Sequence, residues 1–156
     1  MSNVWIGPIF AGLVGTTVLT ILVSLPRLLG MKNAADMVSA LGALVSREKT
    51  PGRAFLPGLL VHYLVGLVFA ALYLVGFRAF GFSFNPITGA FVGVLHGGLA
   101  MMVVEMIIFR RLPRGQDPRA LDNEARVAAA LQFVGHILYG AIVAWVYGLP
   151  VPLGGS

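Results

Sequence analysis

Residues 62–73 read His62-x-Leu64-x-Gly66-x3-Ala70-x2-Tyr73, and the same pattern returns 74 residues later as His136-x-Leu138-x-Gly140-x3-Ala144-x2-Tyr147. A second pair of matching stretches, which begin at Pro8-Ile9 and at Pro86-Ile87, is 78 residues apart. Internal repeats constrain a whole fold, and membrane proteins often contain them. We therefore predict that a unit of two helices was duplicated in tandem, with His62 and His136 at matching depth across a pseudo-two-fold axis.

The composition places this chain in a membrane. It has 156 residues, of which 58% are hydrophobic and 11% charged, and its mean hydropathy is +0.88. A soluble domain carries roughly 25% charged residues. Four stretches are long and apolar enough to cross a bilayer: Val4–Leu25, Ala54–Phe77, Pro86–Phe109 and Val127–Gly148. The fold class that we predict is an all-α bundle of four transmembrane helices, built as two hairpins in a parallel repeat and forming one domain over 1–156.

The first apolar stretch is expected to be a retained helix. No Lys or Arg precedes it, and it is longer than the apolar core of a cleaved signal peptide. The formal net charge is +5. Basic residues concentrate between the first and second stretches and between the third and fourth, which predicts that these loops are cytoplasmic and that both termini lie outside. The pattern favours lipid headgroups, and no nucleic acid, as the partner of these charges.

A shorter helix is predicted over 31–45. Apolar residues recur there at helical spacing, and polar residues such as Lys32 and Asp36 cover much of the rest. The segment is too short to span a bilayer, so we interpret it as an amphipathic helix on the inner membrane surface. The same pattern would also suit docking against a partner subunit.

Small residues four apart form seams along the predicted helices. Gly58, His62, Gly66 and Ala70 make one seam, Gln132, His136, Gly140 and Ala144 make another, and Gly89, Gly93 and Gly97 make a third. Such seams let helix backbones approach closely in lipid. Because two histidines lie within the seams, we expect their side chains to face protein.

Ionisable side chains inside a membrane are costly, so each one is a candidate functional residue. At a rise of 1.5 Å per residue, His62, His136 and Glu105 lie roughly 8–13 Å from the cytoplasmic side, whereas His96 lies roughly 21 Å from it. His96 and Glu105 also differ by roughly 180° around their helix. The sequence therefore predicts a cluster of His62, His136 and Glu105, with His96 pointing elsewhere.

Several chemistries fit this cluster. Two imidazoles and a carboxylate could bind a divalent metal ion. The two histidines could instead ligate haem axially, since helix bundles hold cofactors between facing helices. A proton relay is a third reading. In a purely structural reading, each histidine forms a hydrogen bond to a tyrosine or a carbonyl on the next helix.

No enzyme motif is recognisable, and the chain has no cysteine. The glycines follow helix seams instead of forming a phosphate-binding loop. We therefore expect a protein that is not an enzyme.

The segment Val134-Gly135-His136-Ile137-Leu138-Tyr139-Gly140-Ala141, with the glycine-rich third helix, resembles small four-helix membrane proteins of unknown function from bacteria and archaea. The resemblance implies a multi-pass protein of the cytoplasmic (inner) membrane, and no activity. From the sequence we expect an accessory or assembly subunit of a larger membrane complex, such as one of electron transfer or respiration, with other membrane subunits as partners. The alternatives are a haem- or metal-binding protein and a small homodimeric transporter.

Overall fold

The computed structural model describes residues 6–31, 37–48, 50–111 and 123–149, without the side chains of 104, 105, 107–111 and 125. These residues form five helices and no strand in the described ranges. Their bounds are α1 Ile6–Leu28, α2 Met37–Ser46, α3 Pro51–Phe80, α4 Pro86–Arg111 and α5 Asn123–Gly148. The predicted all-α four-helix bundle is confirmed.

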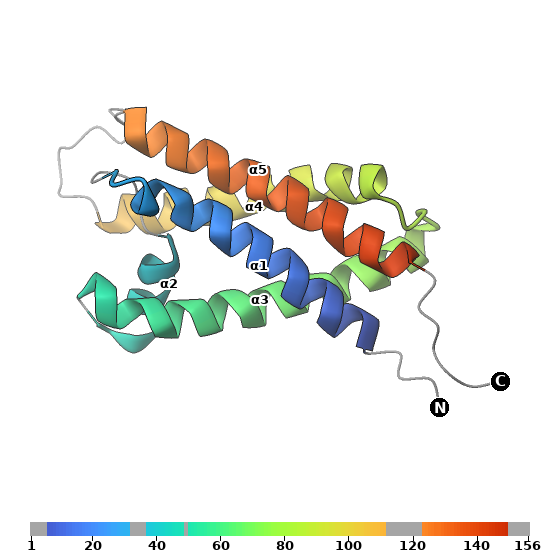
Figure 1. Ribbon diagram of the computed structural model, residues 1–156, viewed down its shortest axis with the longest axis horizontal. Coiled ribbons are helices and arrows are strands. Elements are labelled where there is room, and N and C mark those ends of the chain that lie inside the picture. The colour runs from blue at the N-terminus through green and yellow to red at the C-terminus, as the bar shows by residue number, and fades with distance from the viewer. Residues whose placement is uncertain (1–5, 32–36, 49, 112–122, 150–156) are drawn as a thin grey trace.

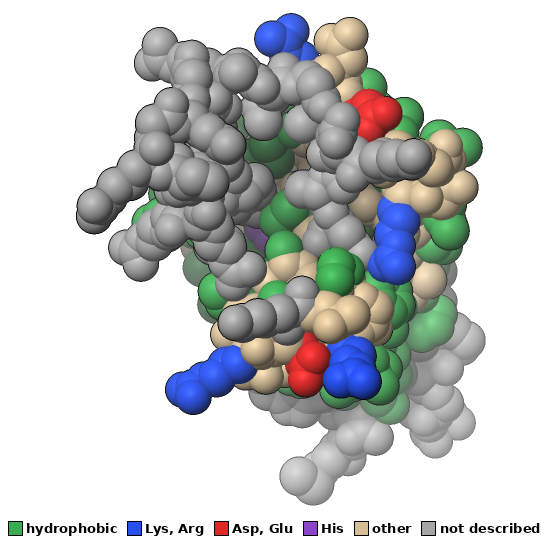
Figure 2. Space-filling view, turned by 90° about the vertical axis from the view of Figure 1, so that its left-hand side faces the viewer, with side chains coloured by type: hydrophobic (Ala, Val, Ile, Leu, Met, Phe, Trp, Pro, Cys, Tyr) green, Lys and Arg blue, Asp and Glu red, His purple; other side chains and the backbone are tan. Residues whose placement is uncertain are grey.

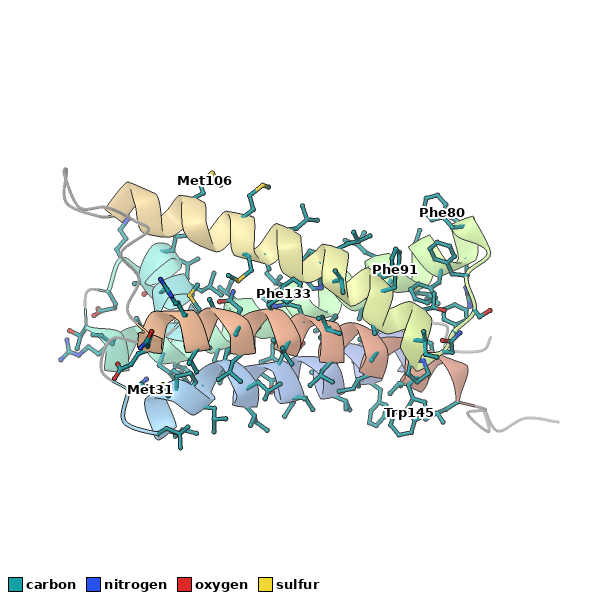
Figure 3. The ribbon with its side chains drawn as sticks, turned by 90° about the horizontal axis from the view of Figure 1, so that it is seen from above. Met31, Phe80, Phe91, Met106, Phe133 and Trp145 are labelled. Carbon is teal, nitrogen blue, oxygen red and sulfur yellow. The ribbon has the colours of Figure 1, made fainter. Side chains whose placement is uncertain are left out.

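Four of the helices, α1, α3, α4 and α5, are long and apolar enough to cross a membrane. Large apolar side chains cover their outer surfaces, and Phe91, Met106 and Trp145 point away from the bundle (Figure 3). Such a surface is stable against lipid and unstable against water. The chain is therefore a multi-pass membrane protein.

The helices pack in the order α4, α5, α1, α3, α2, each against the next (Figure 1). The beginning of α1, the end of α5 and the turn between α3 and α4 all lie at one end of the bundle. At the other end, α2 lies beside the first half of α3. Charged side chains surround this second end, including Arg27 in the last turn of α1 (Figure 2).

The seams of small residues lie between helices, as predicted. A side chain at Gly89 on α4 would overlap the backbone of Gly140 on α5. A side chain at Gly15 on α1 would come within 2.9 Å of the Tyr139 ring on α5. Glycine at these positions therefore lets α5 pack closely against both of its neighbours.

The short helix differs from its prediction. It was expected over 31–45, but Met31 is not helical, residues 32–36 lie outside the described range, and α2 covers Met37–Ser46. Its buried face packs on α3, where Gly42 meets the backbone of Ala54 and Gly58. The sequence argument missed this contact because periodicity shows that a face is apolar without showing what covers it.

The long helices extend beyond the predicted ranges at most ends. The first stretch was predicted to end at Leu25, but Pro26 lies inside α1, which continues to Leu28. The proline ring removes the one backbone hydrogen bond that its own nitrogen would donate, and α1 continues for only two residues beyond it. At the start of α4, the Asn85 side chain accepts a hydrogen bond from the Thr88 amide at 2.9 Å, which caps the helix.

Candidate functional site

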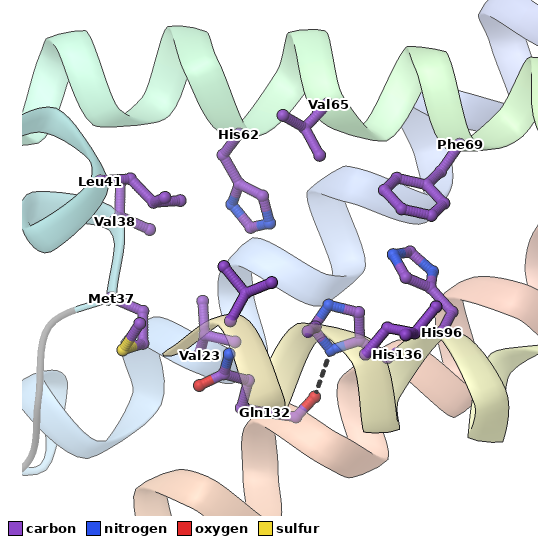
Figure 4. A pocket seen from close by; sticks show the side chains of 13 residues that line it. Val23, Met37, Val38, Leu41, His62, Val65, Phe69, His96, Gln132 and His136 are labelled. Carbon is purple, nitrogen blue, oxygen red and sulfur yellow. Dashed lines mark hydrogen bonds between the residues drawn. The ribbon is translucent and has the colours of Figure 1, made fainter. Parts of the chain in front are cut away.

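A cavity of about 270 Å³ lies in the middle of the bundle, lined by 13 residues that come from all five helices (Figure 4). Nine of them are apolar, and the other four are His62, His96, Gln132 and His136. The cavity is not closed. Val65 on α3 and Leu99 and Val103 on α4 line it and are also 44–55% exposed, so its mouth opens between α3 and α4 toward the lipid-facing surface.

His62 projects into the cavity from α3, and its hydrogen bonds reveal its tautomer. Its Nδ1 lies 3.3 Å from the Thr20 hydroxyl on α1. Thr20 donates its only proton to the carbonyl of Thr16, 2.7 Å away, so toward His62 it acts as the acceptor. Nδ1 of His62 therefore carries the proton, and Nε2 of the neutral ring keeps a free lone pair.

His136 reaches the cavity from α5 with the same tautomer. Its Nδ1 lies 2.7 Å from the backbone carbonyl of Gln132, one turn earlier on the same helix. A carbonyl can only accept, so Nδ1 of His136 is the donor and Nε2 is the unprotonated nitrogen of the neutral ring. The rings of His62 and His136 point toward one another from opposite walls of the cavity (Figure 4).

His96 lies on α4, with its ring between the rings of Phe69 and His136. Its ring stacks on Phe69 of α3 at a centroid distance of 3.8 Å and meets the His136 ring edge-on at 4.8 Å. Its side chain is 8% exposed, and its Nδ1 has no hydrogen-bond partner in the described part of the chain. A buried polar nitrogen without a partner carries a desolvation cost, so it is a natural contact point for a ligand.

The structure thus places His62 and His136 in the lining of one cavity and adds His96, which was expected to point elsewhere. That expectation was wrong. Helical arithmetic places His96 and Glu105 on opposite faces of their helix, but it could not say which of the two faces the bundle. The Glu105 side chain lies outside the described residues.

The cofactor readings gain no support from this geometry. In the described part of the chain, no three His, Asp or Glu side chains are arranged to hold a metal ion. A porphyrin between His62 and His136 would need more space than about 270 Å³, since pockets for far smaller drug-sized molecules span roughly 300–1,000 Å³. Metal or haem binding stays a prediction from the sequence.

The structural reading expected each histidine to bond to a tyrosine or to a carbonyl on the next helix, but the tyrosines with described hydrogen bonds have other partners. Tyr139 on α5 donates to the carbonyl of Gly66 on α3, and Tyr147 donates to the carbonyl of Ala70 at 2.7 Å. Tyr63 pairs with Thr17 at 2.8 Å. Tyr73 is 4% exposed, and its hydroxyl has no partner among the described residues.

Three residues of the site were not anticipated as such. Thr20 donates to the carbonyl of Thr16 on its own helix, and it also orients His62. Gln132 was visible in the seam of the last helix without a role. Phe69 carries no signal at all, because one aromatic residue in an apolar stretch cannot be told from another.

The helix packing departs from a two-fold arrangement. An axis that exchanges α1 with α4 and α3 with α5 would make the α1–α5 and α3–α4 pairs equivalent. Instead α1 packs along α5, whereas in the described ranges no Cα atom of α3 lies within 8 Å of a Cα atom of α4. Side chains, among them the Phe69–His96 stack, bridge that gap. The tandem duplication stays a prediction from the sequence.

Comparison with protein families, curated proteins and solved structures finds no match for this chain. The resemblance to small four-helix membrane proteins of unknown function therefore also stays a prediction.

Proposed function

We propose that this protein binds a small lipophilic molecule, which enters the histidine-lined cavity from the bilayer between α3 and α4. The observation that carries the proposal is the cavity itself, because it combines an apolar lining, a mouth on the lipid-facing surface and converging imidazole nitrogens. Ligand sites are mostly apolar hollows in which a few polar groups orient the ligand.

The size of the cavity limits the ligand. A dry cavity of about 150 Å³ is enough to hold benzene. About 270 Å³ therefore suits one ring with substituents, or a short stretch of lipid chain. Buried polar groups in a membrane are costly without partners, which supports a ligand that hydrogen-bonds to the histidines over a permanently apolar one.

A photoreactive probe tests the proposal. The purified full-length protein in nanodiscs would be exposed to an aryl trifluoromethyl diazirine, irradiated, and digested for mass spectrometry. Labelling should concentrate on cavity residues such as Val65, Leu99 and Val103. Ala100→Trp, which places a large ring at the cavity lining, should remove that labelling.

Ala79→Trp is the matched control, because Ala79 is exposed on α3 and does not line the cavity. It should leave the labelling pattern unchanged. Uniform labelling of all lipid-facing side chains, with no change in Ala100→Trp, would refute ligand binding at this site.

For the location, we propose the cytoplasmic membrane of a bacterium or archaeon with both termini outside, supported by the basic loops. A reporter enzyme that is active only outside the cytoplasm should be active when it is fused after Ser156. The accessory-subunit role and a homodimeric transporter stay predictions, since the exposed apolar surface fits lipid as well as it fits a partner.

A further inference from the structure

A second hollow of about 290 Å³ runs along the same side of the bundle. It lies between α3 and α4, and Phe69, His96 and Leu99 line both it and the central cavity. Two of its other lining residues, Leu72 and Leu95, are more than half exposed. The two hollows therefore adjoin one another, and the second forms an apolar groove that continues from the cavity along the lipid-facing surface.

The central cavity offers hydrogen-bond acceptors on opposite walls. Nε2 of His62 and Nε2 of His136 both keep lone pairs, because Thr20 and the Gln132 carbonyl hold the proton of each ring on Nδ1. A ligand placed between them satisfies both if it carries a donor at each end. An apolar ring with hydroxyl groups at opposite positions has this pattern and a size that the cavity can hold.

From these observations, we propose that the ligand is a lipid-soluble para-hydroquinone whose ring lies between His62 and His136 and whose hydrocarbon tail lies in the groove between α3 and α4. This inference rests on the proposed function, which requires only that the cavity binds a lipophilic molecule. The wall shared by the two hollows, the Phe69–His96 stack, then contacts both the ring and the start of the tail.

The same geometry disfavours the oxidised form. A para-quinone carries carbonyl oxygens, which accept hydrogen bonds and cannot donate them. Facing the two Nε2 lone pairs, these oxygens would find no donors unless both histidines changed tautomer and gave up their Nδ1 partners. His96 is different, because its Nδ1 has no partner in the described part of the chain and its tautomer is not held. The proposed site therefore prefers the reduced ligand.

Three related probes test the donor pattern: a para-benzohydroquinone with a decyl tail, its monomethyl ether, and the corresponding quinone. Binding to the protein in nanodiscs would be measured by equilibrium partition under argon, against empty nanodiscs of the same lipid. The hydroquinone should bind about 10-fold to 100-fold tighter than the quinone, as expected for two neutral hydrogen bonds. The monomethyl ether should fall between them.

Two glycines offer a matched test of the tail. Gly76 lines the groove, and a side chain built there has open space around it, so Gly76→Leu fills the groove without a clash. Gly98 on α4 also has open space and lines neither hollow. Gly76→Leu should weaken hydroquinone binding severalfold, and Gly98→Leu should not. His62→Phe should abolish most of the difference between hydroquinone and monomethyl ether.

The outcomes separate this inference from the proposed function. Equal or tighter binding of the quinone would overturn the hydroquinone assignment, and equal effects of the two leucine variants would overturn the tail position. In either case, the proposed function would stand if the diazirine labels the cavity residues and Ala100→Trp removes that labelling. If the protein without substitutions showed no concentrated labelling of the cavity residues, both the proposed function and the hydroquinone assignment would be refuted.

Discussion

Two sides of this bundle use corresponding helices in different ways. On the closed side, α1 packs directly along α5, with Gly15 against the Tyr139 ring and Leu19 against Gly135. On the open side, α3 and α4 are held apart, and two apolar hollows open between them. The hydroxyl groups of Tyr139 and Tyr147 on α5 donate to carbonyls of α3. The side chains of Thr16 on α1, Tyr73 on α3 and His96 on α4 each keep a buried polar atom without a partner in the described ranges.

The repeated residues explain the difference. At the offsets of the two sequence matches, His96 on α4 corresponds to Val18 on α1, and Phe69 on α3 corresponds to Val143 on α5. The open side therefore carries two stacked rings where the closed side carries two valines. Rings stacked between two helices keep the backbones apart, whereas small side chains let them approach. The ring stack on the open side therefore accounts for the hollows between α3 and α4.

The largest expected effect is a difference between the two sides in their tolerance of added volume. Gly15→Leu on the closed side should lower the free energy of unfolding by about 3 kcal/mol, because the new side chain meets the Tyr139 and Val143 side chains within 3.2 Å. Gly76→Leu on the open side should change it by less than about 0.5 kcal/mol. Denaturant titration in one detergent, followed by circular dichroism, measures both. Similar losses in the two variants would show that the open side is packed after all.

The ring stack on the open side provides the next test. A double-mutant cycle with Phe69→Leu and His96→Leu should give a coupling energy of about 1.5 kcal/mol, since the two rings stack at 3.8 Å. The same cycle with Phe69→Leu and His62→Leu serves as the control, because no ring contact joins that pair in the described part of the chain. A coupling near zero for Phe69 and His96 would remove the spacer that explains the open side.

Much of the fold was predictable, and the reason is the membrane. A helix satisfies its own backbone in lipid and needs about 20 apolar residues to cross it, so hydropathy alone located α1, α3, α4 and α5. The seams of small residues correctly placed His62 and His136 inside the bundle. Periodicity could not place His96, because choosing between two opposite faces of one helix requires knowing its neighbours. Nor could it place Phe69, whose role depends on a ring from another helix.

Paired hydroxyl deletions compare a buried tyrosine that bonds to another helix with a buried tyrosine that has no partner in the described ranges. Tyr139→Phe removes the bond from α5 to the Gly66 carbonyl and should cost about 1 kcal/mol of unfolding free energy. Tyr73→Phe removes a buried hydroxyl that has no partner in the described ranges, so it should be neutral or stabilising. The same detergent titration reports both. A loss of stability in Tyr73→Phe would reveal a partner for that hydroxyl.

The smallest effect concerns a single proton on His62. Thr20→Val keeps the shape of the side chain but removes the oxygen that accepts from Nδ1, so it should cost only about 0.5 kcal/mol of stability. Nitrogen-15 NMR of the imidazole should show His62 fixed with its proton on Nδ1 in the original protein and mixed between tautomers in Thr20→Val. Thr20→Ser restores the oxygen and should restore the single tautomer. Because His136 bonds to the backbone instead, its signals should stay unchanged in both variants. If His62 already carried its proton on Nε2 in the unsubstituted protein, the open side would present a donor where we place an acceptor, and the preference for a reduced ligand would lose its basis.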